Sequence, residues 1–118
     1  EIKFRAFDKA SGLMFGIDGF DKKYVWGYKA GVQIKVEISE VILMQYTGLS
    51  DKNGKEICEG DICIGKRGGS SYAFEVKWDE IDTRFLGYTS SGYICYVGQE
   101  PSVEVIGNIY ENQELIKE

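Results

Sequence analysis

The residues of this sequence that could do chemistry are few, and the chain of 118 residues contains no histidine. Histidine is the commonest general base and a common metal ligand, so its absence removes both roles at once. Four serines stand in Gly-rich stretches, where turns favour small polar residues, and none has a recognisable base beside it: Ser70, Ser71, Ser90 and Ser91. The sequence therefore predicts a protein that is not an enzyme.

The densest acidic cluster consists of Asp79, Glu80 and Asp82, which crowd one predicted turn. Three carboxylates can bind a hard cation such as Ca²⁺ or Mg²⁺. A solvated hairpin end is the commoner explanation, because Asp is a preferred turn residue. We expect no metal at this turn, and a functional acidic turn stays the alternative.

The thiols of the chain are those of Cys58, Cys63 and Cys95. A structural zinc site needs four Cys or His ligands, which this chain cannot supply. We therefore expect the cysteines to be small buried hydrophobic residues that stay reduced in the cytoplasm, and we expect no cofactor. No apolar stretch approaches the roughly 18 residues of a membrane span, and the start shows no signal-peptide pattern.

The segment from Gly60 to Lys66 fits the first seven positions of the phosphate-binding pattern GxxxxGK[ST]. Arg67 stands where Ser or Thr would hold the magnesium ion. The intervening Asp-Ile-Cys-Ile is typical of a strand, whereas the chemistry needs a loop whose amides surround phosphate. We interpret the match as chance.

The elements that must position these residues are predicted to be strands. Val32, Ile34, Val36 and Ile38 alternate with polar residues, the period of a half-buried strand, and residues 2–6 and 72–78 alternate in the same way. Residues 41–46 are more continuously apolar, which favours a strand over a short helical turn. The 16 aromatic residues, 15 glycines and one proline are typical of short strands joined by tight turns. We predict an all-β fold, with one short helical turn that Asn112 would cap.

Three breaks in the pattern predict turns. Asp51 to Gly54 reads Asp-Lys-Asn-Gly, and Asn-Gly tolerates a positive φ at both central positions of a tight turn. Gly60 and Asp61 predict a second bend, in which the Asp61 carboxylate bonds backbone amides. Residues 16–19 contain two glycines and are predicted to end the first hairpin.

Three blocks of sequence carry a family resemblance: 1–9 (EIKFRAFDK), 46–62 (YTGLSDKNGKEICEGDI) and 105–115 (VIGNIYENQEL). Together they resemble the YopX-like proteins of bacteriophages and prophages, in the family's order and over nearly the whole chain. The resemblance implies a phage-encoded accessory protein in a bacterial host, from a family whose biochemical activity is not established. The length of the chain predicts one domain over residues 1–118, with an N-terminal β region at 1–48. The order of elements from Ile57 to Tyr110 resembles small SH3-like barrels, which predicts such a barrel within residues 49–118.

The charge distribution separates two classes of function. Residues 1–59 carry 9 basic and 9 acidic side chains, whereas residues 60–118 carry 5 and 10, which gives the net charge of −5. Duplex-DNA binders are usually basic, so we favour an interaction module that self-associates or binds a host or phage protein. The alternative is a nucleic-acid-binding barrel. Its contacts would be Lys66, Arg67 and Tyr72, or a basic groove in the N-terminal half that carries Lys3, Arg5, Lys9, Lys22, Lys23, Lys29 and Lys35.

Overall fold

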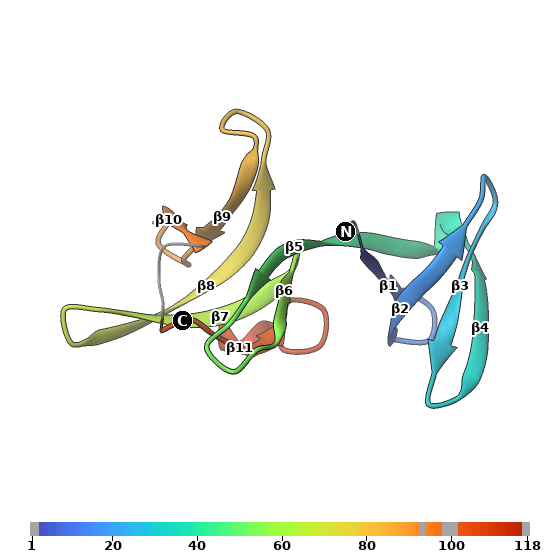
Figure 1. Cartoon of the computed structure of the whole chain (residues 1–118), viewed down its shortest axis with the longest axis horizontal. Coiled ribbons are helices and arrows are strands. Elements are labelled where there is room, and N and C mark those ends of the chain that lie inside the picture. The colour runs from blue at the N-terminus through green and yellow to red at the C-terminus, as the bar shows by residue number, and fades with distance from the viewer. Residues whose placement is uncertain (1–2, 93, 98–101, 117–118) are drawn as a thin grey trace. The chain divides into compact units, whose positions relative to one another are not determined.

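A computed structural model describes residues 3–92, 94–97 and 102–116 (Figure 1). The chain is mostly antiparallel β structure, and the helical part of the described residues consists of short 3-10 turns, which confirms the all-β prediction. The strands are β1 (Phe4–Asp8), β2 (Leu13–Phe20), β3 (Tyr24–Lys29), β4 (Val32–Glu37), β5 (Val41–Ser50), β6 (Glu56–Cys58), β7 (Asp61–Arg67), β8 (Ser70–Asp79), β9 (Arg84–Tyr88), β10 (Ile94–Tyr96) and β11 (Glu104–Asn108). The 3-10 turns are η1 (Ile38–Glu40) and η3 (Gln113–Leu115). No helix among the described residues is long and apolar enough to cross a membrane.

The chain divides into two compact units, Glu1–Tyr46 and Thr47–Glu118. Strand β5 begins in the first unit and ends in the second. The boundary between these units lies between residues 46 and 47, whereas the sequence analysis placed the boundary between the β region and the barrel part between residues 48 and 49. The two units are described separately below.

Strands β4-β3-β2-β1 of the first unit form an antiparallel meander, which β5 and then β6 extend to a six-stranded sheet in the order β4-β3-β2-β1-β5-β6 (Figure 1). In the register, Ala6 of β1 stands between Phe15 of β2 and Leu43 of β5. The buried core consists of Ala6, Phe15, Val25 and Val41, against which side chains of alternating positions pack: Leu13, Ile17, Ile34, Val36 and Ile38. The alternation seen in residues 32–38 therefore sends the aliphatic side chains to one face of the sheet.

Strands β3 and β4 are joined by a two-residue turn of Ala30 and Gly31, whose φ angles are +51° and +81°. Two successive left-handed residues are the signature of a type I′ turn, which matches the twist of the flanking strands. Alanine is an unusual residue in this conformation because its Cβ crowds the backbone. Residues 30–31 carry no Asn-Gly signal, and this turn was not predicted.

The predicted break at residues 16–19 was wrong, because β2 continues to Phe20. The two glycines sit within the strand, and the register shifts at a bulge between Ile17 and Gly19. A Cβ atom at Gly19 would lie 2.7 Å from the Trp26 ring of the neighbouring strand. The glycine thus lets the indole lie flat on the backbone of β2, and it marks a bulge and a close approach rather than the end of the strand.

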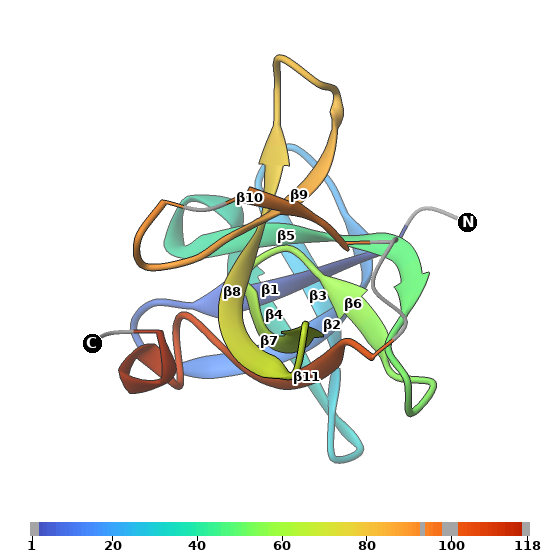
Figure 2. The ribbon, with the colours of Figure 1, turned by 90° about the vertical axis from the view of Figure 1, so that its left-hand side faces the viewer.

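The second unit contains a five-stranded sheet in the order β10-β9-β8-β7-β11, in which β8 bends along its length (Figures 1 and 2). Its buried core joins residues from four strands (β6, β7, β8 and β10) and two residues just outside strands: Ile57, Cys63, Phe74, Val76, Cys95, Val97 and Val103. The strand order is open, with β10 and β11 at its two ends. The likeness to an SH3-like barrel stays a prediction.

The turn at Asp51–Gly54 differs in detail from the sequence prediction. Gly54 has a φ of +83° and donates its N–H to the Asp51 carbonyl at 3.0 Å, but Asn53 is not left-handed. The Asp51 carboxylate explains the difference, since its Oδ1 accepts the N–H groups of both Asn53 and Lys55, each at 2.9 Å. This side chain organises the turn, so that only the glycine needs a positive φ.

The next bend is built on Gly60 and Asp61. Gly60 has a φ of +83°, and its N–H donates to the Val76 carbonyl at 2.9 Å. Asp61 is 1% exposed, and its Oδ2 accepts the N–H of Cys58 at 2.8 Å. The carboxylate therefore closes the bend from inside the protein.

The last strand, β11, carries a bulge between Val105 and Gly107. Asn112 stands at the N-cap position of η3, as predicted, but its side chain makes no capping hydrogen bond there. Its Oδ1 accepts the N–H of Asn108 at 3.1 Å instead. At Gly107 a Cβ atom would lie 2.5 Å from that same oxygen, so the glycine leaves the room that the asparagine occupies.

Candidate binding surfaces

A groove of about 290 Å³ lies on the first unit, and every residue that lines it belongs to that unit. Its lining consists of Lys3, Phe4, Gly16, Ile17, Asp18, Tyr28 and Tyr46. Lys3 directly precedes β1, and the other residues come from β1, β2, β3 and β5, so the pairing of these strands brings the lining together. We call this feature the first-unit groove.

Gly16 leaves the first-unit groove open. In the register it stands between Arg5 of β1 and Tyr28 of β3. Apart from its chain neighbours, no described atom lies within 4 Å of the position that a Gly16 Cβ would take. The missing side chain therefore creates a gap on the sheet face beside Tyr28.

Aromatic rings and one ammonium group flank this gap. Tyr28 is 57% exposed, and Lys3 places its Nζ atom 5.3 Å from the centroid of the Tyr46 ring. The Tyr46 N–H also donates to the Lys3 carbonyl at 2.9 Å, which fixes the two residues side by side. Phe4 meets the exposed Phe20 edge to face, with centroids 6.1 Å apart. Such half-exposed aromatic surface suits flat or apolar ligands.

The polar groups of the first-unit groove have opposite charges. Lys3 is cationic, and Asp18 stands at the bulge of β2. A bulge re-aims the side chain that it carries, so it directs the carboxylate differently from a regular strand position. The groove thus offers both a cation and a hydrogen-bond acceptor to a ligand.

An aromatic row continues from the groove along β3. Tyr24, Trp26 and Tyr28 alternate with the buried Val25 and Gly27, so the three rings share one face of the strand. Two cations lie against the first ring, because the Nζ atoms of Lys23 and Lys35 are 5.5 and 4.7 Å from the centroid of Tyr24. Aromatic and basic side chains are therefore interleaved on this face.

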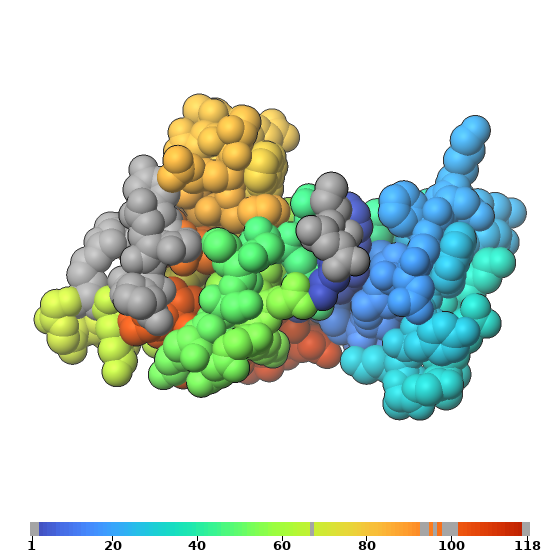
Figure 3. Space-filling model, in the orientation of Figure 1, coloured from blue at the N-terminus to red at the C-terminus, as the bar shows by residue number. Residues whose placement is uncertain are grey.

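The second surface is the tip of the β8–β9 hairpin, residues 79–84, which projects from its unit (Figure 3). Ile81 is 91% exposed at this tip. Below it, Trp78 is 45% exposed and meets Phe85 at a centroid distance of 5.0 Å. The tip therefore presents apolar surface above a packed aromatic pair.

The carboxylates predicted as an acidic cluster surround this tip. Asp79 organises the turn, since its Oδ2 accepts the N–H of Asp82 at 3.0 Å. Tyr88 donates its hydroxyl to Asp79 Oδ1 at 3.4 Å, and burial followed by the Asp79 charge raises the Tyr88 pKa. Among the described residues, no group of three acidic, Cys or His side chains is placed to hold a metal ion.

Lys66 and Tyr72, which the sequence grouped as nucleic-acid contacts, lie on opposite faces of the β7–β8 hairpin. In the register Gly65 pairs with Tyr72, and Lys66 pairs with Ser71. Tyr72 packs on the core beside Phe74, with ring centroids 5.8 Å apart. Lys66 and Arg67 belong to the end of β7, and the turn of this hairpin is formed by residues 68–69. Contact of Lys66, Arg67 and Tyr72 with nucleic acid stays a prediction.

The three thiols are buried, as the sequence predicted. Cys58 and Cys63 are 0% exposed and Cys95 is 4% exposed. Burial, and then the nearby Asp61 charge, raises the pKa of Cys63 to about 12. The pattern from Gly60 to Lys66 forms a bend and strand β7, so its amides serve the sheet rather than a phosphate.

Sequence reasoning did not identify the first-unit groove, although it placed a possible basic groove in this half of the chain. A usable signal was present, because alternation alone puts Tyr24, Trp26 and Tyr28 on one face of a strand. The gap at Gly16 could not be found in this way, since residues 16–19 were interpreted as a chain break.

The comparisons with known proteins agree with the family resemblance. A family model described as YopX protein matches residues 3–117. The chain is similar in structure to protein EF1440 from Enterococcus faecalis, with 27% identity, a TM-score of 0.67 and coverage of 99% of each chain. It is also similar to protein yopX from Bacillus subtilis, with 23% identity, a TM-score of 0.68 and coverage of 98% of each chain. A comparison with curated proteins finds no match. The extent of the family match, nearly the whole described chain, shows that this protein belongs to the YopX family.

Proposed function

We propose that this protein is a non-enzymatic interaction module, encoded by a phage or prophage and working in the bacterial cytoplasm. The observation that carries the proposal is the exposed apolar tip of the β8–β9 hairpin, where Ile81 is 91% exposed above Trp78. An aliphatic side chain held out on a tight hairpin gains free energy by entering a pocket of another protein.

The charges around Ile81 indicate what kind of pocket this would be. Asp79, Glu80 and Asp82 stand beside it in the turn. The whole second unit has 7 basic and 13 acidic residues, a net charge of −6, whereas the first unit has 7 and 6, a net charge of +1. An apolar pocket rimmed by Lys or Arg would complement the tip in both shape and charge. The partner is then a host or phage protein with such a pocket, or a second copy of this chain.

The absence of an enzymatic role is part of the proposal. The chain has no histidine, and Cys63 is a buried thiol with a raised pKa, so neither the usual base nor an activated nucleophile is provided. The three free buried thiols are compatible with a reducing compartment.

The test compares Ile81→Asp with Val32→Asp. Val32 is an aliphatic residue of the first unit that is 65% exposed, so it controls for adding a charge at an exposed apolar site. Light scattering at micromolar concentration measures self-association against the 13.3 kDa monomer, and a pull-down from phage-infected bacteria measures capture of other proteins. We expect assembly or specific capture that Ile81→Asp abolishes and Val32→Asp preserves. A monomer that captures nothing specific, or an equal response of both variants, would contradict the proposal.

A further inference from the structure

We propose that the first-unit groove binds single-stranded nucleic acid, one base at a time, and prefers bases that carry an exocyclic amino group. This site is independent of the hairpin tip and lies in the other unit of the chain. The proposal rests on the shape of the groove, the placement of its rings and the two charges at its edges.

The shape favours one flat group. At about 290 Å³ the groove is slightly smaller than the range of about 300–1,000 Å³ that is usual for small-molecule pockets. Its open part lies over Gly16, next to the exposed ring of Tyr28. A base that lies over the glycine would stack on this ring, and such stacking stabilises binding of any base because every base has a π-face.

The two charged side chains of the groove would contact different parts of a nucleotide: Lys3 the phosphate and Asp18 the base. Lys3 is held beside Tyr46 by a backbone hydrogen bond and lines the groove, where its positive charge would attract a phosphate. Asp18 offers only acceptor oxygens when ionised. Acidic side chains accept hydrogen bonds from the N4 amino group of cytosine, whereas thymine presents the O4 oxygen at that place and would repel the carboxylate.

The row of aromatic rings on β3 offers a bound single-stranded nucleic acid a path out of the groove. Tyr24 shares a face with Tyr28 and lies four residues away, which is about 13 Å along a strand. Lys23 and Lys35 lie against the Tyr24 ring, so a second base and its phosphate would meet the same combination of aromatic face and cation. The nearby acids Asp21 and Glu37 limit the affinity. The first unit has a net charge of only +1, so we expect micromolar rather than tighter binding.

The experiment titrates the full chain into labelled deoxycytidine and deoxythymidine decamers and a labelled duplex, followed by fluorescence anisotropy at low and moderate salt. We expect the cytidine strand to bind most tightly and the duplex least. Gly16→Val fills the gap in a backbone conformation that tolerates side chains, and Tyr28→Ala removes the stacking face. Each should weaken cytidine-strand binding by about tenfold or more.

Two variants test the charges. Asp18→Asn should bring the affinities for the two strands within about twofold of each other, because the carboxylate no longer discriminates. Lys3→Gln should weaken binding to both strands and reduce the salt dependence by about one phosphate contact. Lys77→Gln is the matched control, since Lys77 lies 5.4 Å from the Tyr88 ring in the second unit but lines no part of the groove, and it should bind like the unaltered protein.

Several results would overturn the proposal. One is that no single strand binds at low salt, and another is that binding survives both Gly16→Val and Tyr28→Ala. Equal losses in Lys3→Gln and Lys77→Gln would show general electrostatic attraction only. Loss of self-association in Gly16→Val without any binding of oligonucleotides would show that the groove receives a second copy of the chain. Thermal unfolding of each variant separates loss of binding from loss of folding.

Discussion

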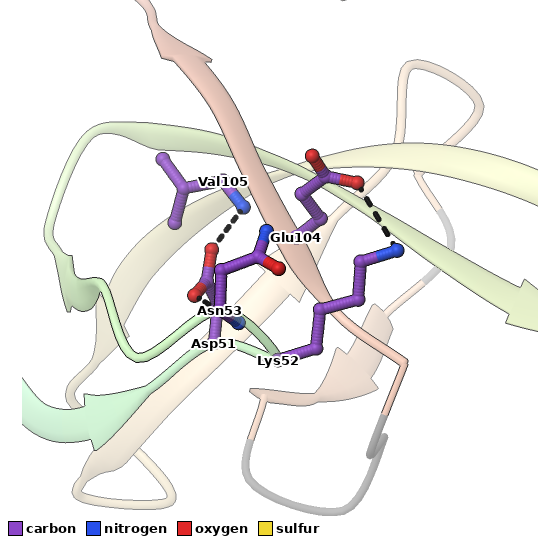
Figure 4. A network of polar contacts seen from close by, with 5 residues as sticks. All are labelled: Asp51, Lys52, Asn53, Glu104 and Val105. Carbon is purple, nitrogen blue, oxygen red and sulfur yellow. Dashed lines mark hydrogen bonds and ion pairs between the residues drawn. The ribbon is translucent and has the colours of Figure 1, made fainter.

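The carboxylate of Asp51 accepts a hydrogen bond of 2.9 Å from the backbone N–H of Val105, a residue 54 positions later in the chain (Figure 4). The Lys52 N–H donates to the Val103 carbonyl at 2.9 Å, and the Lys52 ammonium group pairs with Glu104 at 3.3 Å. One short turn is thereby attached to the last strand by both backbone and side-chain contacts. Asp51 is 8% exposed, so its bonds are protected from water.

Asp51→Ala should lower the free energy of unfolding by about 2–4 kcal/mol, because it leaves the N–H groups of Asn53, Lys55 and Val105 without the carboxylate. Lys52→Ala is the control, since the pair that it breaks is roughly half exposed and should contribute less than about 1 kcal/mol. Urea unfolding followed by tryptophan fluorescence measures both. Equal effects of the two changes would contradict the role given to Asp51.

Stability should fall in acid, and Asp51 should contribute to the fall. Burial raises the pKa of Asp51, but the backbone N–H donors of Val105, Lys55 and Asn53 outweigh it and hold the pKa below the usual value. A carboxylate whose pKa is lower in the folded state stabilises the protein above its unfolded pKa of about 3.9. That contribution is lost as the pH falls through the folded pKa. Urea midpoints from pH 7 to pH 2.5 should therefore decline less steeply in Asp51→Asn, and a parallel decline would count against the assignment.

Gly54→Ala and Gly16→Ala form a matched pair. At both glycines the space for a Cβ atom is open, but only Gly54 has a left-handed φ, at +83°. Gly54→Ala should therefore destabilise by about 1 kcal/mol or more, from backbone strain alone, and Gly54→Val should do so at least as strongly. Gly16→Ala should be neutral or slightly stabilising in its strand. The melting temperatures of the two alanine variants test this prediction. Similar values would show that a side chain at position 54 causes no backbone strain.

Ala30→Asn should stabilise the protein by about 0.5–1 kcal/mol. Ala30 has a φ of +51° at the first position of a type I′ turn, where asparagine is preferred and alanine is strained. Ala10→Asn is the control, because Ala10 is exposed and its φ is not positive. A gain at Ala10 that equals the gain at Ala30 would mean that the turn geometry is not responsible.

The cysteines should resist thiol reagents in the folded protein. Deprotonation is required for reaction, and the pKa of Cys63 is raised to about 12 within a residue that is 0% exposed. Ellman's reagent at pH 8 should therefore detect almost no thiol until urea unfolds the chain, when all three react. Rapid labelling without denaturant would contradict the burial.

The sequence predicted the strands better than the binding surfaces, because alternation is a local signal and the surfaces depend on how strands pair. Alternation of Val32, Ile34 and Val36 is a local signal, and it located β4 correctly because one face of that strand is buried. Glycines were ambiguous, since Gly19 serves a bulge beneath Trp26 and not a chain break. The left-handed Ala30 has no local signal at all, because its conformation is imposed by the paired strands.

Candidate sites were harder to predict, because they depend on register. Lys66 and Tyr72 are close in sequence, yet the pairing of Gly65 with Tyr72 sends them to opposite faces. The first-unit groove needs Lys3 and Tyr46 beside each other, and residues 43 positions apart in the sequence carry no mark of that contact. The tip of the β8–β9 hairpin was accessible to sequence reasoning, since its acidic residues formed a visible cluster.

The bond between Asp51 and Val105 has a consequence for the order in which the protein folds. The first unit pairs mostly consecutive strands and ends at Tyr46, so it can form while the ribosome is still making the rest of the chain. The turn at Asp51 must wait until β11 has been synthesised. We therefore expect the second unit to be the slow step of folding and the part that is exposed to proteases and chaperones during synthesis.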